Sequence, residues 1–458
     1  MKPQSQPQTP PELLPDDSID FRALRQNRLR EAERVAPLQF VPPTETQATD
    51  APAQAVETQP ALSPDESKKF DRLVKSKPKT SCAPCHWGLL VAALLLTAVS
   101  VPLVYSASTA IALDQHGGDP NFFLWRQIGY GLVGLVLMLG VSRVAPEKLR
   151  GLAWGLYAFA LLGLLATKFS PLGYSMGNVE RWVKLGPLTF QFSELAKIAV
   201  IGVMADFWSR AARISQRSMK PWIAAAALGG APFALTFMQP HLSAALVLGL
   251  LPLAVAFFAG APRRQFWIVL GPVAVVLALT IGLCKTHAMP FLAPYQQDRI
   301  AAKFGGDEAG DARGNNYQSL QGQRAIMRGG LSGVGLGNSL YKNGHLPAPH
   351  TDFIFAVIAE ETGAWGALSL LALYGAIVFF CFQIGHNAGT GMEALLCAGV
   401  GTLWAVQVAG NIAVVTGVFP VTGLPLPILT FGGSGLWCAL LGLGLVLAVS
   451  RGQCEGEA

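Results

Sequence analysis

The sequence predicts an all-α polytopic membrane protein with ten transmembrane helices and a large extracytoplasmic loop between helices 7 and 8. Of its 458 residues, 51% are hydrophobic and only 14% are charged, which exceeds the apolar content of one soluble core. The apolar residues come in blocks near the length of about 20 residues that a bilayer core of about 30 Å requires. Lipid offers the backbone no hydrogen-bond partner, so these blocks are expected to be helices.

The predicted spans follow one another along most of the chain. They are residues 87–107, 122–142, 152–169, 193–208, 221–238, 242–259, 265–284, 352–383, 394–418 and 429–449. The fourth is short, and only the turn Gln239–His241 separates the fifth from the sixth. An even number of spans places both ends of the chain on the same side of the membrane.

The distribution of Lys and Arg predicts which side that is. These residues concentrate before the first span, at 143–150, at 209–220 and at Arg263–Arg264. Short loops rich in Lys and Arg face the cytoplasm, so the N- and C-termini are predicted to be cytoplasmic and the 285–351 loop to be outside. The net charge of +6 then reflects membrane orientation and gives no support for nucleic-acid binding.

Three parts of the chain are expected. Residues 1–85 are rich in Pro, Gln, Thr, Glu and Ala, a composition that predicts a disordered cytoplasmic N-terminal tail. Residues 86–450 form the ten-helix membrane domain, which includes the 285–351 loop, and residues 451–458 form a cytoplasmic C-terminal tail. The first apolar block starts too late to be a cleavable signal peptide.

The segment with Cys82, Cys85 and His86 fits the C-x-x-C-H pattern of c-type haem attachment. It directly precedes the first span on the predicted cytoplasmic side, whereas such haem is attached outside, and no soluble domain surrounds it. No haem is therefore expected. Acylation of either cysteine beside the membrane and inert thiols are the remaining interpretations.

Charged residues inside predicted spans are costly and are normally paired or functional. Glu194 and Lys197 are three residues apart at the start of the fourth span, so they can form an ion pair on one helical face. A structural ion pair and a role in a polar cavity are both open. Glu360 and Glu361 point about 100° apart on a helix, so at most one of them readily faces a cavity.

Two outer segments combine polar groups with irregular backbone. The 285–351 loop carries Asp298, Arg299, Lys303, Asp307, Glu308, Asp311, Arg313, Arg324, Arg328, Lys342, His345 and His350. Carboxylates can transfer protons, and cations suit a phosphate or diphosphate, although the charges of a solvated loop can also simply face water. The second segment, 417–435, is too rich in Pro and Gly for a continuous helix. It is a candidate wall of an outward-facing groove, because irregular backbone at membrane depth must be buried or line a cavity.

Several strings in these regions resemble the SEDS family, the FtsW, RodA and SpoVE proteins of bacterial cell-wall synthesis. They are "ERWVKLGPLTFQFSELAKIA" at 180–199, "YQSLQGQRAIMRGGLSGVGLGNSLYKNGHLPAPHTDF" at 317–353, "HTDFIFAVIAEETG" at 350–363, "QVAGNIAVVTG" at 407–417 and "GVFPVTGLPLPILTFGGSGL" at 417–436. The resemblance covers residues 87–450. The "GLGNS" and Lys of 335–342 look most like the FtsW branch.

The resemblance implies an inverting peptidoglycan glycosyltransferase in the bacterial cytoplasmic (inner) membrane. Such an enzyme polymerises lipid II on the outer face during cell division, with a class B penicillin-binding protein transpeptidase and other divisome membrane proteins as partners. The reaction needs a general base at the acceptor hydroxyl and positive charge at the departing diphosphate. A divalent cation, Mg²⁺ or Mn²⁺, could share that charge, but the sequence identifies no ligands for it.

Candidate site residues follow from the resemblance and from the charges of the outer segments. Those expected to bind substrate are Arg299, Lys303, Arg324, Arg328, Lys342, His350, Asp352 and Ser434. Those expected in the polar core are Glu194, Lys197 and Glu360.

The catalytic position departs from the family pattern, R-[VI]-x-x-F-x-D-P. Here the segment reads "RIAAKFGGDEAGD", and the position of the Asp falls on Gly305 or Gly306. Asp307 is the leading candidate, since the glycines before it allow the chain to shift by one residue. Glu308 and Asp311 are the alternatives, and a displaced base or lost activity is also open.

Two further departures suggest a divergent branch. The family's Gln-Pro-Asp after the fifth span is Gln-Pro-His here, which replaces a carboxylate with His241. The Pro of the family's Gln-Pro-Ser-Glu is Phe192.

Two other functions remain open. One is a lipid II flippase or transporter, which would suit carboxylates near the midplane and broken helices. The other is a catalytically silent divisome scaffold, which the missing Asp-Pro pair keeps open. The absence of internal repeats and the concentration of charge in an outer loop favour chemistry at the surface over transport.

Overall fold

The structure, a computed structural model, describes residues 86–115, 117–171, 173–176, 179–186, 188–215, 218–262, 264–271, 317–344, 346 and 349–455. The described residues all belong to one unit, Thr80–Ala458. The long helices are α3 (Trp87–Gln115), α4 (Phe122–Val141), α5 (Pro146–Phe169), α6 (Phe192–Ser215), α7 (Lys220–Phe237), α8 (Leu242–Phe258), α12 (Ile354–His386), α13 (Gly391–Val415) and α14 (Gly433–Glu455). A shorter helix, α11 (Tyr317–Gly329), precedes α12.

These nine long helices coincide with nine of the predicted spans, and the turn between α7 and α8 lies where the sequence placed it. The seventh predicted span is helical over residues 264–271, and its remainder lies outside the described residues. Within the described ranges, six helices are long and apolar enough to cross a membrane: α3, α4, α5, α12, α13 and α14. The chain is a multi-pass, mostly helical membrane protein, as predicted.

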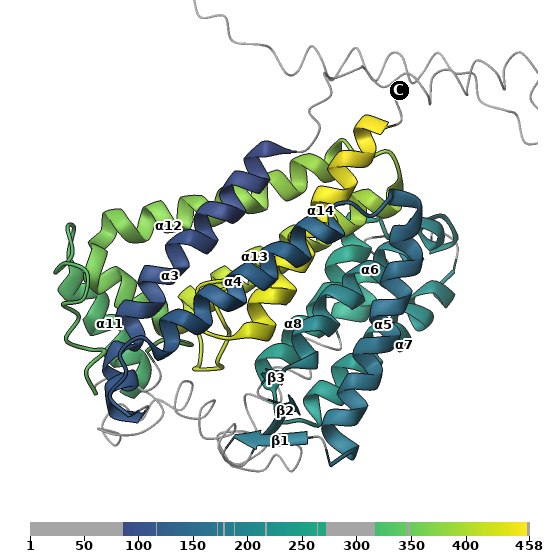
Figure 1. Cartoon of the computed structure of the whole chain (residues 1–458). Coiled ribbons are helices and arrows are strands. Elements are labelled where there is room, and N and C mark those ends of the chain that lie inside the picture. The colour runs from purple at the N-terminus through teal and green to yellow at the C-terminus, as the bar shows by residue number, and fades with distance from the viewer. Residues whose placement is uncertain are drawn as a thin grey trace, which may run out of the picture. The chain divides into compact units, whose positions relative to one another are not determined.

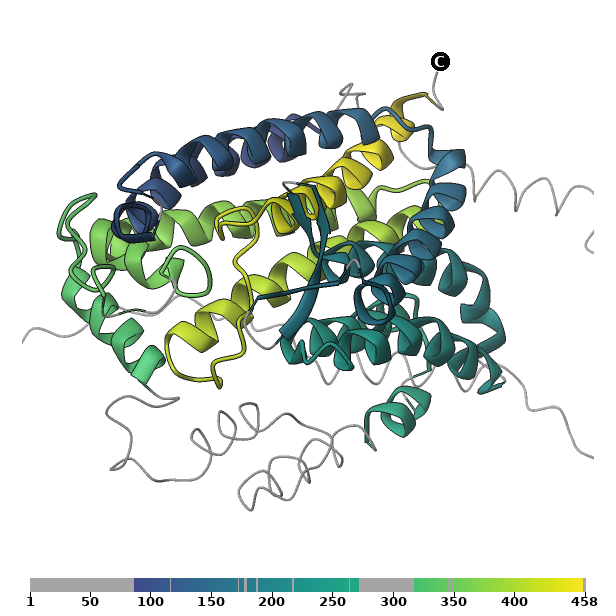
Figure 2. The ribbon, with the colours of Figure 1, turned by 60° about the horizontal axis from the view of Figure 1, so that its bottom comes forward.

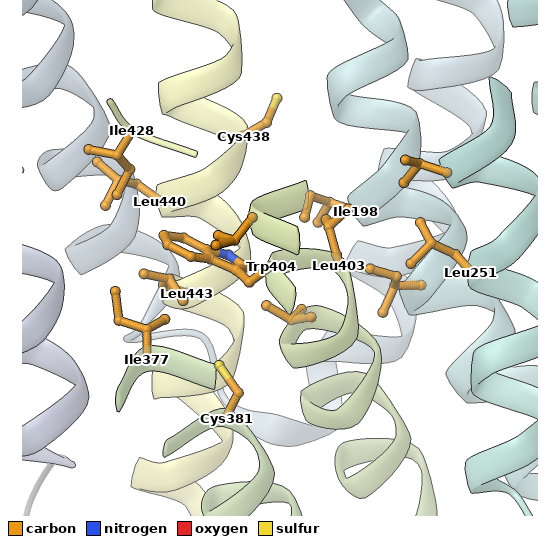
Figure 3. Packing of buried hydrophobic residues seen from close by; sticks show 14 of the residues in the cluster. Ile198, Leu251, Ile377, Cys381, Leu403, Trp404, Ile428, Cys438, Leu440 and Leu443 are labelled. Carbon is orange, nitrogen blue, oxygen red and sulfur yellow. The ribbon is translucent and has the colours of Figure 1, made fainter. Parts of the chain in front are cut away.

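Helix α6 is the centre of the helical packing. Nearly every residue from Phe192 to Asp206 is buried, and α6 contacts α5, α7, α8, α13 and α14. On another side, α3, α4 and α14 run next to one another (Figures 1 and 2). Figure 3 shows buried apolar side chains packed between helices, among them Trp404 of α13 and Leu443 of α14.

A small antiparallel sheet, absent from the prediction, joins α5 to α6. Its strands are β1 (Gly173–Met176), β2 (Val179–Leu185) and β3 (Leu188–Phe190), in the order β1-β2-β3. Along β2, Val183 is buried and Lys184 is exposed, the alternation of a strand with one covered face. The sheet packs on α5 and places Arg181 and Trp182 of β2 near the N-terminal end of α6.

Helix α12 is broken near its start, at Gly363, which has φ 68° and ψ −168°. In a continuous helix, the carbonyl of Glu360 would accept from the N–H of Ala364. Instead Ala364 N–H donates to Gly330 O (2.9 Å), and Val334 N–H donates to Glu360 O (3.0 Å). The glycine-rich loop after α11 therefore satisfies the backbone groups that the break releases.

This docking requires a residue without a side chain at Gly333. Its φ is +78°, and an added Cβ would lie 2.2 Å from the carbonyl oxygen of Glu361. Gly337 in the same loop has φ +86°, but an added Cβ would meet nothing within 4 Å. The two glycines thus share a backbone conformation and differ in their surroundings.

We expect Gly333→Ala to destabilise the protein much more than Gly337→Ala. Both substitutions place an alanine in a left-handed conformation, at a cost of about 1 kcal/mol, and only Gly333→Ala adds a clash with backbone, worth about 2 kcal/mol more. Thermal unfolding of the purified chain in detergent measures the difference. Equal melting temperatures for the two variants would contradict the described docking.

Candidate functional site

A cavity of about 500 Å³ opens where β2, β3, the start of α6, the α7–α8 turn and the 420–435 segment meet. Its charged and polar lining includes Arg181, Glu194, Lys197, His241, Asp352 and Ser434. The structure thus brings four residues predicted from the sequence, Glu194, Lys197, Asp352 and Ser434, to one cavity. The 420–435 segment forms one side of it, which confirms the wall predicted from its Pro and Gly content.

The ion pair of α6, between Glu194 and Lys197, is part of this lining. Lys197 Nζ is 2.7 Å from both Oε1 and Oε2 of Glu194, and both residues are buried. The carboxylate lies in the first turn of α6, where the helix dipole favours a negative charge. Both interpretations of the pair are therefore compatible with the geometry, since it is an intrahelical ion pair and also lines the cavity.

His241 lies in the turn between α7 and α8, outside both helices, and is 7% exposed. Its Nδ1 lies 3.2 Å from Gln191 Nε2 and 3.4 Å from Ser193 Oγ. Burial lowers the pKa of the His241 imidazole well below its usual value, and the positive charges of Arg181 and Lys197 lower it further. The ring is therefore neutral at neutral pH.

The residues before α12 are tied to the cavity wall through their backbone. Phe431 N–H donates to His350 O (3.0 Å), and the Asn411 amide donates to Asp352 O (2.9 Å). The His350 ring packs against Phe123 and Phe431, with centroids 4.9 and 5.9 Å away. Asp352 lines the cavity, whereas His350 packs behind it.

Glu360 and Glu361 are both buried, and neither lines the cavity. Glu360 forms an ion pair with Arg328 of α11 and accepts hydrogen bonds from Ser339 Oγ and from Leu340 N–H, the latter at 3.0 Å. Glu361 forms an ion pair with Lys342 at 2.8 Å, and Ser106 Oγ of α3 donates to its carboxylate. Residues 328–342 therefore supply partners to both carboxylates, although these point in different directions.

Two of the cations predicted to bind substrate, Arg328 and Lys342, thus form ion pairs with buried carboxylates outside the cavity. Lys342 is 6% exposed and also contacts Ser106 Oγ at 3.1 Å. The Arg328 side chain is partly exposed, at 39%, and pairs with Glu360. Arg324, four residues earlier on α11, is exposed and has no ion-pair partner within the described part of the chain.

Several predicted residues lie outside the described residues: Arg299, Lys303, Asp307 and its alternatives Glu308 and Asp311, as well as Cys82 and Cys85. Of the C-x-x-C-H segment only His86 is described, and its Nδ1 accepts a hydrogen bond from Leu89 N–H (3.2 Å) at the start of α3. Among the described side chains, no group of three or more His, Cys, Asp and Glu residues could hold a metal ion.

Arg181 and His241 line the cavity but were not predicted from the sequence as site residues. Arg181 belongs to the string at 180–199 that carries the resemblance, and His241 was noted only as a departure from it. Both residues belong to segments that resemble the family or depart from it. That the two residues lie close together depends on the sheet, which brings β2 to the α7–α8 turn. Arg181 Nη2 donates to Pro240 O at 2.5 Å across that contact.

Known proteins resemble this chain over most of its length. Residues 86–455 match the family model for FtsW, RodA and SpoVE, described as cell cycle protein. The probable peptidoglycan glycosyltransferase FtsW of Thioalkalivibrio sulfidiphilus is 33% identical over 371 residues, which are 80% of this chain and 90% of that protein. Stage V sporulation protein E of Bacillus subtilis is 32% identical over 363 residues, covering 79% of this chain and 96% of that protein.

A solved structure has the same arrangement. Its subject is the structural coordination of polymerization and crosslinking by a peptidoglycan synthase complex. The matching chain is 30% identical, with a TM-score of 0.65, and the match covers 81% of this chain and 98% of that chain.

The paired burial of Lys342 and Glu361 predicts strong coupling between them. Lys342→Met should cost about 3–5 kcal/mol of unfolding free energy, because it leaves the Glu361 charge buried without its partner. Adding Glu361→Gln to Lys342→Met should recover a large part of that loss, because no uncompensated charge remains. Denaturant unfolding of the four proteins of this double-mutant cycle, in detergent, measures the coupling.

Lys220→Met is the matched control, because Lys220 is exposed at the start of α7. It should change the unfolding free energy by less than about 0.5 kcal/mol. Additive effects of the Lys342 and Glu361 substitutions would show that the two side chains do not interact.

Proposed function

We propose that this chain, which belongs to the FtsW/RodA/SpoVE family of cell cycle proteins, is a peptidoglycan glycosyltransferase that polymerises lipid II during cell division. The observation that carries the proposal is the cavity of about 500 Å³ in which cations and carboxylates of β2, the start of α6 and the segment before α12 meet. A lipid-linked diphosphate sugar needs positive charge at its leaving group and a carboxylate at its acceptor. Both kinds of group line this cavity.

The position of the cavity supports chemistry at the outer face. Helix α6 starts at the cavity with Glu194, and 16 residues later Arg210 pairs with Asp206 at its other end. At 1.5 Å per residue, those ends are about 24 Å apart along the helix. Arg150 at the start of α5 also pairs with Asp206, at 3.4 Å. The Arg-rich end is proposed to face the cytoplasm, so the cavity faces outward and both termini are cytoplasmic, with the chain in the inner membrane.

The proposed reaction is an inverting displacement. The acceptor sugar hydroxyl attacks the anomeric carbon of the donor, a C–O bond forms, and the bond from that carbon to the lipid diphosphate breaks. A carboxylate takes the hydroxyl proton, and Asp307 is the proposed base. Arg299, Lys303 and Arg324 are the proposed contacts of the diphosphate.

The other proposed contacts divide into two groups by their surroundings. Asp352 and Ser434 line the cavity and are proposed to bind the substrate directly. Arg328 and Lys342 hold the outer loop on α12 through buried carboxylates, and His350 packs behind the cavity wall. We propose that Arg328, Lys342 and His350 orient the loop and the cavity wall, and that the substrate contacts this loop and wall.

The proposed partners follow from the relatives. A chain of similar structure comes from a peptidoglycan synthase complex that couples polymerization to crosslinking. We propose that this chain likewise works with a crosslinking enzyme, a class B penicillin-binding protein, and with other divisome membrane proteins.

Asp307→Asn should lower the rate of glycan polymerisation by at least about 100-fold, the usual contribution of a general base. Asp311→Asn is the matched control: it removes a carboxylate of the same segment and should retain activity. The assay gives the purified chain, with its class B penicillin-binding protein, labelled lipid II in liposomes and separates the polymer by gel electrophoresis.

Full activity of Asp307→Asn would place the base elsewhere. Wild-type protein that makes no polymer but moves lipid II across the liposome membrane would indicate a transporter. Wild-type protein that does neither would indicate a scaffold.

A further inference from the structure

The turn that precedes α8 presents hydrogen-bond donors to the cavity. Pro240, His241 and Leu242 all line it, so the N-terminus of this 17-residue helix lies at the cavity wall. The first backbone N–H groups of a helix have no partner within it, and the aligned peptide dipoles place partial positive charge there. No side chain caps this end, because the N-cap residue is His241 and its side chain makes no capping bond.

The tautomer of His241 follows from its partners. Gln191 Nε2 carries only protons to donate, and Ser193 Oγ can donate as well, so Nδ1 of the neutral ring accepts. The single proton of a neutral imidazole is then on Nε2. Nε2 makes no hydrogen bond to any described residue, while the residue is more than nine-tenths buried and lines the cavity. His241 therefore directs an N–H donor into the cavity.

Two positively charged side chains act on His241. Burial is the largest cause of the lowered pKa of His241. The positive charges of Arg181 on β2 and Lys197 on α6 also oppose its protonation. A potential that disfavours a proton favours an anion. Two carboxylates face the same cavity: Glu194 is paired with Lys197 at 2.7 Å, and Asp352 lies before α12.

We infer that His241 and the N-terminus of α8 form a subsite that binds an oxygen of a lipid-linked diphosphate, with His241 Nε2–H as donor. Helix N-termini bind phosphate groups because their amides and dipole act together. A neutral imidazole adds a donor without adding a carboxylate that would repel the anion. The inference rests on the proposed function, because the diphosphate is that of the lipid-linked substrate and of the lipid product.

Two substitutions separate the donor of His241 from its structural role. Gln places an amide nitrogen, a donor, near the position of Nε2, whereas Asn places its amide oxygen, an acceptor, near the position of Nδ1. His241→Gln should therefore keep the donor in the cavity, and His241→Asn should keep only the contacts to Gln191 and Ser193. Thermal unfolding of both variants checks that each is folded.

The measurement is equilibrium binding of undecaprenyl diphosphate to the purified full chain in nanodiscs. His241→Asn should weaken binding by about 10- to 100-fold, the value of a hydrogen bond to a charged group, and His241→Gln should bind like the wild type. Undecaprenol, which lacks the diphosphate, should bind all three proteins equally. Inorganic diphosphate should bind more weakly than the lipid and show the same loss in His241→Asn.

Equal weakening by the two substitutions, or no weakening by either, would overturn the inference. A loss of undecaprenol binding in His241→Asn would also overturn it, because the effect would then concern the lipid chain. Inorganic diphosphate that binds as tightly as the lipid would overturn the lipid-linked assignment. Binding does not require polymerisation, so a wild-type chain that makes no polymer but shows the expected binding pattern would refute only the proposed function.

Discussion

The buried carboxylates of Glu360 and Glu361 are the constraint on which the packing of α11, the following loop and α12 depends. A charge removed from water costs several kcal/mol unless a partner of opposite charge and further hydrogen bonds compensate it. The compensation comes from Arg328 on α11, from Lys342 in the following loop and from Ser106 on α3. These segments are far apart in sequence and have to meet at α12. The charge pairs thus fix the loop, and the loop replaces the helical hydrogen bonds that α12 lacks at its break.

Fixing the loop also positions the cavity. Between the loop and α12, the backbone carbonyls of His350 and Asp352 accept hydrogen bonds from Phe431 and Asn411. The ion pairs at the start of α12 are therefore connected to the cavity wall. A second buried pair, Glu194 with Lys197, anchors the opposite side of the cavity within α6. The ion pairs on the two sides include two that are buried, Glu361 with Lys342 and Glu194 with Lys197, and salt screens these little.

The positions of the helices could be predicted from the sequence, but the ion pairs between distant side chains could not. Apolar blocks of membrane length can only form helices, so span positions follow from composition. The short sheet is harder to predict, because seven residues of β2 carry little pattern and depend on packing against α5. At most one of Glu360 and Glu361 was expected to face a cavity, and neither lines the one described. The sequence does not show that a glycine-rich loop reaches both carboxylates. Arg328 and Lys342 looked like ligand-binding cations for the same reason, since sequence does not show which loop charges have buried partners.

The distribution of charge in the cavity bears on how a diphosphate could be both bound and released. Lys197 is paired with Glu194 at 2.7 Å, so it is less available for a direct contact with a bound anion. Apart from Arg181, which donates to Pro240 O, the donors at the α8 end are neutral: the His241 ring and the backbone amides of a helix N-terminus. Hydrogen bonds from such donors to a charged group are worth about 1.5–3 kcal/mol each, whereas an ammonium group buried against a diphosphate would form a contact that is costly to break. An enzyme that repeats its reaction must free the lipid diphosphate after each transfer. Dipolar donors suit that requirement, since they add hydrogen bonds to the leaving group at the α8 end without adding a buried ion pair there.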